Sequence, residues 1–383
     1  MLGEIKNKAI GGCCFLEGPR AVKKEELQQL TDLINYVFRT SSGREADMHI
    51  SFPLFISEEN LNNLLVMVDN GKPVSHMGLW INDFSYFGQP IRVGSLGSVC
   101  TDPNYRGQGL ATKLMDAVLD HLEAEGVDLL LVSGGRGLYQ RAQCFKAGEV
   151  TWYNIPKNSS LPRFEIVVNP PVEYLAELWS REPIHSHREL NNFKALVKAA
   201  PLPRCIQHQS TVYLTKIGNA PLAYIQALNA PNGGVLFYEW AGDRTVLLEI
   251  ASYISNLPET REVTWPLPSW EKALHNLMPK LDAKVNRTEE LSGTYRIIRF
   301  ASFIEKISKY LQEHYGTNEL QGFDEGDMQV LHYLDEELKL DRKNMSELLF
   351  SGLLPKNIPS KMKSLFLEVA PLPLPWPIGF DYI

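Results

Sequence analysis

The chain has 383 residues, which is enough for two or three domains of ordinary size. Hydrophobic residues make up 44% and charged residues 22%, and these proportions exclude a disordered or fibrous chain. The net charge is −7 without a basic stripe or tail, so we do not expect nucleic acid as the main ligand. No run of apolar residues approaches the roughly 18 that a membrane helix needs, so we expect no membrane partner.

The N-terminal stretch and the cysteines indicate a cytoplasmic protein. MLGEIKNKAIGGCCFLEG has no apolar segment of signal-peptide length, so secretion is not expected. The cysteines are odd in number, and they form no CxxC pair or Cys/His cluster with metal-ligand spacing. We therefore expect free thiols in a reducing cytoplasm and no metal site. The cysteines are Cys13, Cys14, Cys100, Cys144 and Cys205.

The first part of the chain predicts a helix followed by three strands. Residues 23–39 carry apolar residues at helical spacing. Residues 64–80 predict a hairpin, because Asn70-Gly71 can adopt the positive φ angles of a tight turn between two apolar runs. A third apolar run, residues 91–101, ends at Asp102-Pro103, where proline stops the strand pairing.

The next segment predicts a β-α-β unit. From Leu110 to Glu125 an apolar residue recurs every fourth position, and Gly126 is a typical helix end. The mostly apolar residues 127–132 follow, as expected for a strand buried on both faces.

Residues 208–300 repeat the same order of hairpin, strand, helix and strand, so we interpret them as a diverged internal repeat. The two copies differ in the turn before the helix. The first copy has two glycines between Arg106 and Ala111, whereas the second has one between Ala241 and Val246. In the second copy Asp243 stands where an anion would lie.

The last part of the chain predicts a helix over residues 303–315 and a second helical stretch through Met345 and Phe350. The chain ends in a proline-rich tail, residues 370–383. The tail is either a flexible ligand for another protein or a strap along the protein's own body. Its apolar side chains favour the strap, because exposing them to water is costly.

The turn from Arg106 to Ala111 can bind phosphate. A helix N-terminus presents free backbone N–H groups and a partial positive charge, and Gly107 and Gly109 allow the backbone to curl around a pyrophosphate. The turn does not match the P-loop pattern, because no Gly-Lys-Ser/Thr follows. It does not match GxGxxG either, since Thr112 occupies the place of the last glycine.

Arg106, Gly109 and Ala111 instead match Q/R-x-x-G-x-G/A, and with the strands and helix around them the chain resembles the GNAT acetyltransferase superfamily. This resemblance implies an α/β (α+β) fold with a mixed, splayed central sheet and acetyl-CoA bound in the opening. By position it assigns the pantetheine arm to Val99, Cys100 and Thr101, and the thioester end to Gly134 and Gly135. It assigns the pyrophosphate to Arg106, Gly107, Gln108, Gly109, Leu110, Ala111 and Thr112.

The resemblance also implies a catalytic acid. Tyr139 matches the tyrosine that family members use to protonate the departing thiolate, although it could instead anchor the loop to the core. The family usually has Gly-Phe after this tyrosine, whereas here Gln143-Cys144-Phe145 follow. No acidic residue lies on residues 91–101 to act as the base, which leaves His76 and Asp83 as candidates.

Over its whole length the chain is similar to Eis-like acetyltransferases, in which a catalytic domain, a degenerate second copy and a sterol-carrier-like domain follow one another. We expect these domains at residues 1–160, 161–299 and 300–383, the last one short and ending in the proline-rich tail. The resemblance implies that the terminal carboxylate, here that of Ile383, reaches the active site. It also makes a homo-oligomer possible.

The leading interpretation is an acetyl-CoA-dependent N-acetyltransferase acting on a primary amine of a small molecule or peptide. A non-catalytic acyl-CoA-binding or sensing protein is the alternative, supported by the altered Gln143-Cys144-Phe145 stretch. A third possibility is a carrier of hydrophobic ligands acting through the C-terminal domain. The sequence leaves the amine open, because acceptor pockets are built from variable loops.

Overall fold

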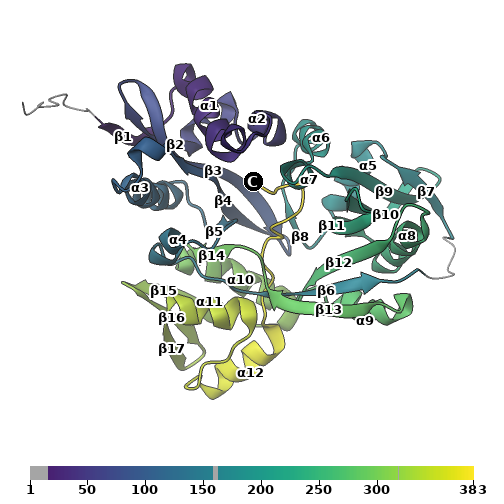
Figure 1. Ribbon diagram of the computed structural model, residues 1–383. Coiled ribbons are helices and arrows are strands. Elements are labelled where there is room, and N and C mark those ends of the chain that lie inside the picture. The colour runs from purple at the N-terminus through teal and green to yellow at the C-terminus, as the bar shows by residue number, and fades with distance from the viewer. Residues whose placement is uncertain (1–15, 158–162, 318) are drawn as a thin grey trace, which may run out of the picture.

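The computed structural model describes residues 16–157, 163–317 and 319–383, so Cys13 and Cys14 lie outside the described residues. The described chain forms two seven-stranded mixed sheets and a three-stranded antiparallel sheet (Figure 1). This mixed α/β architecture confirms the predicted fold class.

The first sheet contains the predicted hairpin and β-α-β unit. Asn70 and Gly71 have φ angles of 49° and 75°, as a tight hairpin turn requires. The strand order is β1-β2-β3-β4-β5-β14, with β8 paired to β3. The strands are β1 (Leu16–Ala21), β2 (Leu64–Asp69), β3 (Lys72–Tyr86), β4 (Gln89–Thr101), β5 (Leu129–Val132), β14 (Thr294–Ile297) and β8 (Ile184–Ser186).

The helices α1 (Leu27–Phe38) and α3 (Leu110–Ala124) confirm the two helices predicted in this part of the chain. The apolar residues of α3, which recur every fourth position, are buried in the core beneath the first sheet. Helix α1 begins later than residue 23, because Lys24–Glu26 form a 3₁₀ turn. Two short helices complete this part: α2 (Met48–Ser51) and α4 (Gly137–Arg141).

The second sheet repeats the order of the first, as the internal repeat predicts, because β9, β10, β11 and β12 are neighbours in the same order as β2, β3, β4 and β5. Listed from the opposite edge, its strand order is β13-β6-β12-β11-β10-β9-β7. The strands are β13 (Lys284–Glu290), β6 (Glu149–Ile155), β12 (Glu262–Pro268), β11 (Gly234–Gly242), β10 (Ala220–Asn229), β9 (Gln209–Ile217) and β7 (Glu165–Val168). The helices are α5 (Val172–Trp179), α6 (Leu190–Ala199), α7 (Pro201–Cys205), α8 (Arg244–Asn256) and α9 (Lys272–Leu277).

The two sheets exchange strands. Strand β6 belongs to the second sheet although it precedes residue 160, and β14 pairs with β5 of the first sheet although it precedes residue 300. Strand β8, which lies between β7 and β9 in the chain, pairs with β3 of the first sheet. The chain therefore crosses between the two sheets several times.

The third sheet joins the other two through a shared core. It consists of β15 (Leu320–Glu325), β16 (Met328–Tyr333) and β17 (Glu336–Asp341), next to α10 (Phe300–Tyr315), α11 (Arg342–Ser351) and α12 (Ser360–Val369). One hydrophobic cluster contains Ile91 of the first sheet, Val150 of the second and Phe303 of α10. Burial of these side chains together fixes the three parts relative to one another.

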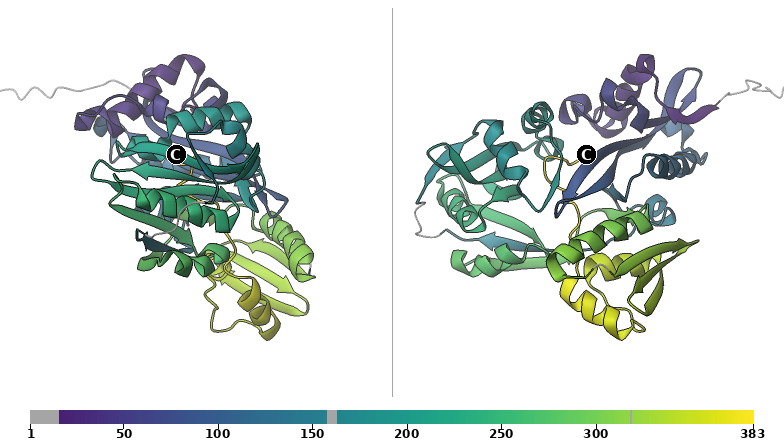
Figure 2. Two further views of the ribbon diagram at one scale, coloured as in Figure 1. Left: turned by 90° about the vertical axis from the view of Figure 1, so that its right-hand side faces the viewer. Right: turned by 180° about the vertical axis from the view of Figure 1, so that it is seen from behind.

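The C-terminal tail is a strap, as its apolar composition predicts. It runs from α12 up between the two large sheets, and the chain ends there (Figures 1 and 2). Leu372, Leu374 and Phe380 are no more than 1% exposed. The strap therefore contributes to the cores on both sides.

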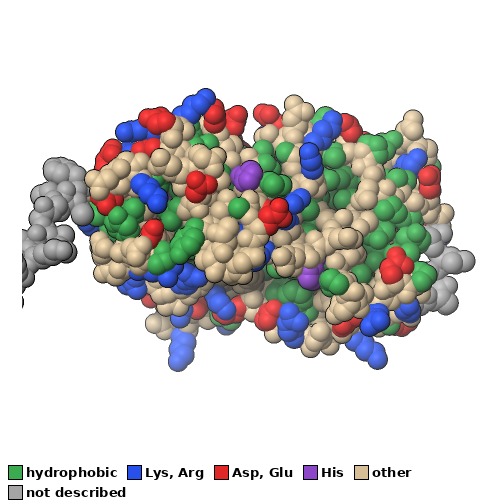
Figure 3. Space-filling view, turned by 45° about the horizontal axis from the view of Figure 1, so that its top comes forward, with side chains coloured by type: hydrophobic (Ala, Val, Ile, Leu, Met, Phe, Trp, Pro, Cys, Tyr) green, Lys and Arg blue, Asp and Glu red, His purple; other side chains and the backbone are tan. Residues whose placement is uncertain are grey.

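The surface carries charges of both signs. Basic and acidic side chains are interspersed over the face shown in Figure 3. Within the described ranges, no helix is both long and apolar enough to pass through a bilayer.

Candidate active site

Strands β4 and β5 separate at the centre of the first sheet. Their parallel pairing ends at Leu96 and Val132, whereas β4 continues to Thr101. The last part of β4, from Gly97 to Thr101, therefore has no strand paired with it on the side where β5 lies earlier in the strand. We call this gap between the two strands the opening. Val99, Cys100 and Thr101 lie on this part of β4.

The glycine turn lies directly after β4, at the N-terminus of α3. Gly107 and Gly109 have φ angles of 77° and 75°, in the left-handed region that favours glycine. Residues 106–109 are exposed, and no atom lies within 4 Å of where a Cβ of either glycine would stand. Arg106 Nε donates to the carbonyl oxygen of Thr101 at 3.3 Å.

No side chain caps the N-terminus of α3. The N–H of Thr112 donates to the Gly109 carbonyl oxygen at 3.1 Å, whereas those of Leu110 and Ala111, the first two of the helix, point to the space around the turn. The exposed Arg106 adds a positive charge there. This arrangement suits a pyrophosphate, which is the group expected from the sequence.

The corresponding turn of the second sheet is closed. Asp243 caps α8, and its Oδ1 accepts hydrogen bonds from the N–H groups of Thr245 and Val246 at 2.7 and 3.1 Å. The hydrogen bonds to Asp243 lower its pKa, and the one from the Thr245 side chain has the largest effect. The carboxylate thus occupies the place where an anionic ligand would bind, and this difference between the copies is the one read from the sequence.

Tyr139 lies in α4 beside the loop that follows β5. It is 7% exposed, and its ring would contact a Cβ at Gly134 at 3.3 Å. Burial raises the pKa of Tyr139, so the phenol is protonated at neutral pH. Gln143, at the position of the usual glycine, has a φ angle of 55° and so adopts a glycine-like conformation despite its side chain.

The terminal residue lies against β4 at the start of the opening. A Cβ added to Gly97 would be 3.3 Å from the carboxyl carbon of Ile383. Tyr382 and Ile383, together with Phe52 and Trp80, line an apolar cavity of about 20 Å³. The structure thus brings Ile383 to the end of the β4–β5 pairing. Gly97, which makes room for it, belongs to no motif and was not identified from the sequence.

The two candidate bases are placed differently. His76 is fully buried, with Nδ1 3.0 Å from the Leu65 carbonyl oxygen and Nε2 2.9 Å from Ser98 Oγ. Since a carbonyl only accepts, Nδ1 carries the proton and Nε2 accepts from Ser98. Burial lowers the pKa of His76 to about 4, so the ring is neutral.

Both nitrogens of His76 are therefore engaged within the sheet. Asp83 lies further along β3, where its side chain is 73% exposed and 3.9 Å from Arg92. It pairs with Arg92 at the other end of β4, away from Gly97. Neither arrangement suits a base at the opening.

The described cysteines are free thiols. Burial raises the pKa of Cys100 and of Cys144 to about 12. Both are therefore protonated at neutral pH and are poor nucleophiles. Cys100 contributes its backbone to the opening, and its thiol packs in a core.

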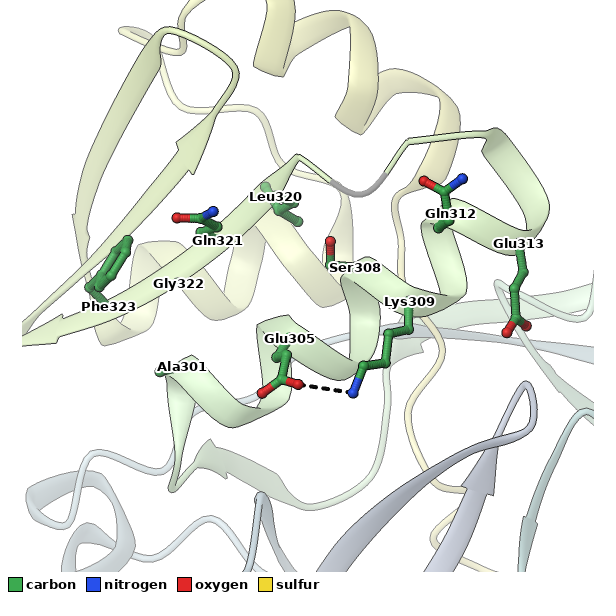
Figure 4. Close-up of a pocket in the computed structure, with 10 residues that line it drawn as sticks. All are labelled: Ala301, Glu305, Ser308, Lys309, Gln312, Glu313, Leu320, Gln321, Gly322 and Phe323. Atoms are coloured by element: carbon green, nitrogen blue, oxygen red, sulfur yellow. Dashed lines mark hydrogen bonds and ion pairs between the residues drawn. The ribbon is translucent and has the colours of Figure 1, made fainter.

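A separate groove lies in the C-terminal part of the protein, between α10 and β15 (Figure 4). Its volume is about 540 Å³, and Lys309 and Glu305 form an ion pair of 2.9 Å on its helical wall. Charged and amide side chains lie on the helical wall, and β15 contributes Leu320 and Phe323 to the lining. The lining residues are Ala301, Glu305, Ser308, Lys309, Gln312, Glu313, Leu320, Gln321, Gly322 and Phe323.

Comparisons with known proteins agree with this geometry. Residues 19–142 match the family described as an acetyltransferase (GNAT) domain. A GCN5-related N-acetyltransferase from Anabaena variabilis ATCC 29413 has a similar structure, with a TM-score of 0.64, 15% identity, and coverage of 95% of this chain and 99% of that one. No curated protein matches the sequence.

Two further solved structures are similar. A conserved protein from Enterococcus faecalis V583, described as a probable N-acyltransferase, has a TM-score of 0.62 and 17% identity, covering 84% of each chain. Eis1 from Mycobacterium abscessus has a TM-score of 0.57 and 11% identity, also covering 84% of each chain. At these identities the likeness shows a shared fold over most of the chain.

The substitution Gly109→Glu tests the turn. We expect it to weaken binding of acetyl-CoA by at least about 100-fold, because it places a negative charge at the helix N-terminus and a side chain in a left-handed conformation. Isothermal titration calorimetry measures the affinity. Gly316→Glu is the matched control, since Gly316 has a φ angle of 72° and open space at the end of α10. Equal affinity in the two variants would contradict the assignment.

Proposed function

We propose that this protein transfers the acetyl group of acetyl-CoA to a primary amine, because residues 19–142 match the GNAT acetyltransferase domain, a family that uses an acyl-CoA donor. The observation that carries the proposal is the uncapped, glycine-lined N-terminus of α3 beside the opening between β4 and β5. The second sheet, where Asp243 caps the same position, has no such turn.

The donor would bind along the end of β4. Backbone groups of Val99, Cys100 and Thr101 that are directed away from β3 would pair with the amides of the pantetheine arm, as in a strand pair. The N–H groups between Gly107 and Thr112 would hold the pyrophosphate, with Arg106 as a counter-charge. Gly134 and Gly135, after β5, would leave room for the thioester end.

Tyr139 would act as the acid. A thiolate leaving group needs a proton, and a phenol whose pKa is raised by burial holds that proton at neutral pH. The position of the ring beside Gly134 supports this role, because Gly134 is proposed to lie at the thioester end of the donor.

The Ile383 carboxylate would act as the base. The amine nitrogen forms a bond to the acyl carbon as the carbon–sulfur bond breaks. The proton of the amine goes to the carboxylate, and the proton of Tyr139 goes to the sulfur. This assignment is supported by the close approach of Ile383 to Gly97 and by the placement of His76 and Asp83.

The direct test is steady-state release of coenzyme A thiol from acetyl-CoA with a panel of primary amines. We expect turnover with at least one amine, and mass spectrometry should show an acceptor heavier by one acetyl group. Tight binding of acetyl-CoA without any transfer would instead favour the acyl-CoA-binding or sensing protein.

The substitution Tyr139→Phe should lower kcat by about 100-fold, because general acid catalysis contributes on that order or more. The KM for acetyl-CoA should change little, since the ring remains. Tyr36→Phe, at an exposed tyrosine on α1, is the matched control. Intact turnover in Tyr139→Phe would remove this residue from the mechanism.

Removal of Ile383 alone should lower kcat by at least about 10-fold, because the new terminal carboxylate lies up to roughly 3.5 Å short of its original place. Ile383→Ala keeps the carboxylate at its position in the chain and should retain more turnover than the shortened chain. Steady-state kinetics compare the two proteins. If the shortened chain is as active as Ile383→Ala, the carboxylate is not the base.

A further inference from the structure

Arg188 forms a buried ion-pair cluster with the C-terminal strap. Its side chain is 2% exposed, and its two terminal nitrogens donate to both oxygens of Glu239 on β11 at 2.9 and 2.8 Å. Nη2 also donates to Asp381 Oδ2 at 2.6 Å. The guanidinium lies 4.0 Å from the ring centre of Trp179 and 4.7 Å from that of Phe193.

Further contacts hold the strap at the same place. Ser186 Oγ donates to Asp381 Oδ2 at 2.5 Å. The N–H of Phe380 donates to Glu239 Oε2 at 2.8 Å, and the indole N–H of Trp376 donates to the Tyr238 carbonyl oxygen at 2.7 Å. Residues 376–381 are thus bound to β11 and to the segment before α6.

Only Tyr382 separates the anchored Asp381 from Ile383. Two residues of extended chain span at most about 7 Å, so the anchor at Asp381 restricts where the terminal carboxylate can lie. Within that reach the carboxyl group meets Gly97 on β4 of the first sheet. Glu239, the other partner of Arg188, belongs to the second sheet, whereas Ser186 ends β8 and Gly97 lies on β4, both in the first sheet; we call each large sheet with its helices a unit.

The two contact points are related by the internal repeat. Strand β11 precedes α8 as β4 precedes α3, and each pairs with its preceding strand through a register shift. That shift is next to Ser98 in the first unit and next to Glu239 in the second. The strap therefore crosses equivalent parts of the two units, first at Glu239 and then at Gly97.

We propose that Arg188 is a positioning residue, which through Asp381 holds the terminal carboxylate of Ile383 in the opening of the first unit. The second unit, whose own helix N-terminus is closed by Asp243, then serves to place the C-terminus for the reaction of the first. This inference rests on the proposed function and extends it to a part of the chain without a donor site.

The cluster is suited to this task by its charge. A buried guanidinium facing two carboxylates makes charge-assisted hydrogen bonds in a site of low dielectric constant, so the geometry is held strongly. Arg188 remains paired with Glu239 when Asp381 is neutral. The substitution Asp381→Asn therefore weakens the anchor of the strap without leaving an unpaired charge in the second unit.

The first measurement is release of Ile383 by carboxypeptidase Y, followed by intact-mass spectrometry of the full chain. We expect Asp381→Asn to lose Ile383 at least about 10-fold faster than the original protein. Asp335→Asn is the matched control, because Asp335 forms an exposed ion pair with Lys361 on the third sheet's side of the protein. It should leave the rate unchanged. An unchanged rate in Asp381→Asn overturns the proposal.

The second measurement is steady-state acetyl transfer. Asp381→Asn should lower kcat by about 10-fold and leave the KM for acetyl-CoA within about 2-fold, because the donor site is untouched. A merely structural role would instead alter both constants or the unfolding midpoint. Faster loss of Ile383 with an unchanged kcat also overturns the positioning role.

These outcomes are distinct from a failure of the proposed function. If the original protein transfers acetyl to no amine, the proposed function is wrong, and with it the catalytic part of this inference. The carboxypeptidase rates still report whether the charge of Asp381, which pairs with Arg188, holds the C-terminus. If the original protein is active, both measurements apply.

Discussion

The end of the β4–β5 pairing is the constraint on which the rest of the site depends. Beyond Leu96 and Val132 the two strands no longer share hydrogen bonds, and the backbone of β4 continues without that neighbour. Backbone N–H and C=O groups need partners, so this stretch can accept an extended ligand. The glycine turn then places the N-terminus of α3 after the end of β4, and the terminal residue of the chain packs against the face of β4 at Gly97.

The two units show how one fold carries different roles after small changes. In the first, a turn with two left-handed glycines leaves the helix N-terminus free. In the second, Asp243 satisfies the same N–H groups, so an anion has no place there. The charges of the second unit are directed elsewhere: Glu239 and Arg188 form a buried cluster that contacts the strap.

Much of this was predictable from local patterns. The spacing of apolar residues predicted α1, α3, α8 and the hairpins, because helix and strand periodicities act over short distances. The turn chemistry at Asn70-Gly71 and at Gly107 to Gly109 was readable for the same reason. The exchange of β6 and β14 between the sheets was not, since strand pairing is decided by contacts between segments more than 100 residues apart.

The sequence by itself determined the class of fold, the repeat, the two-glycine turn and its loss in the second copy, because these depend on residues close together in the chain. Only the tertiary structure decided which groups meet at the site. Gly97, Arg188 and Asp381 belong to no motif, and their roles arise from the strap's path between the two sheets. That path is set by burial of Leu372, Leu374 and Phe380 in separate cores, a packing that no local pattern encodes.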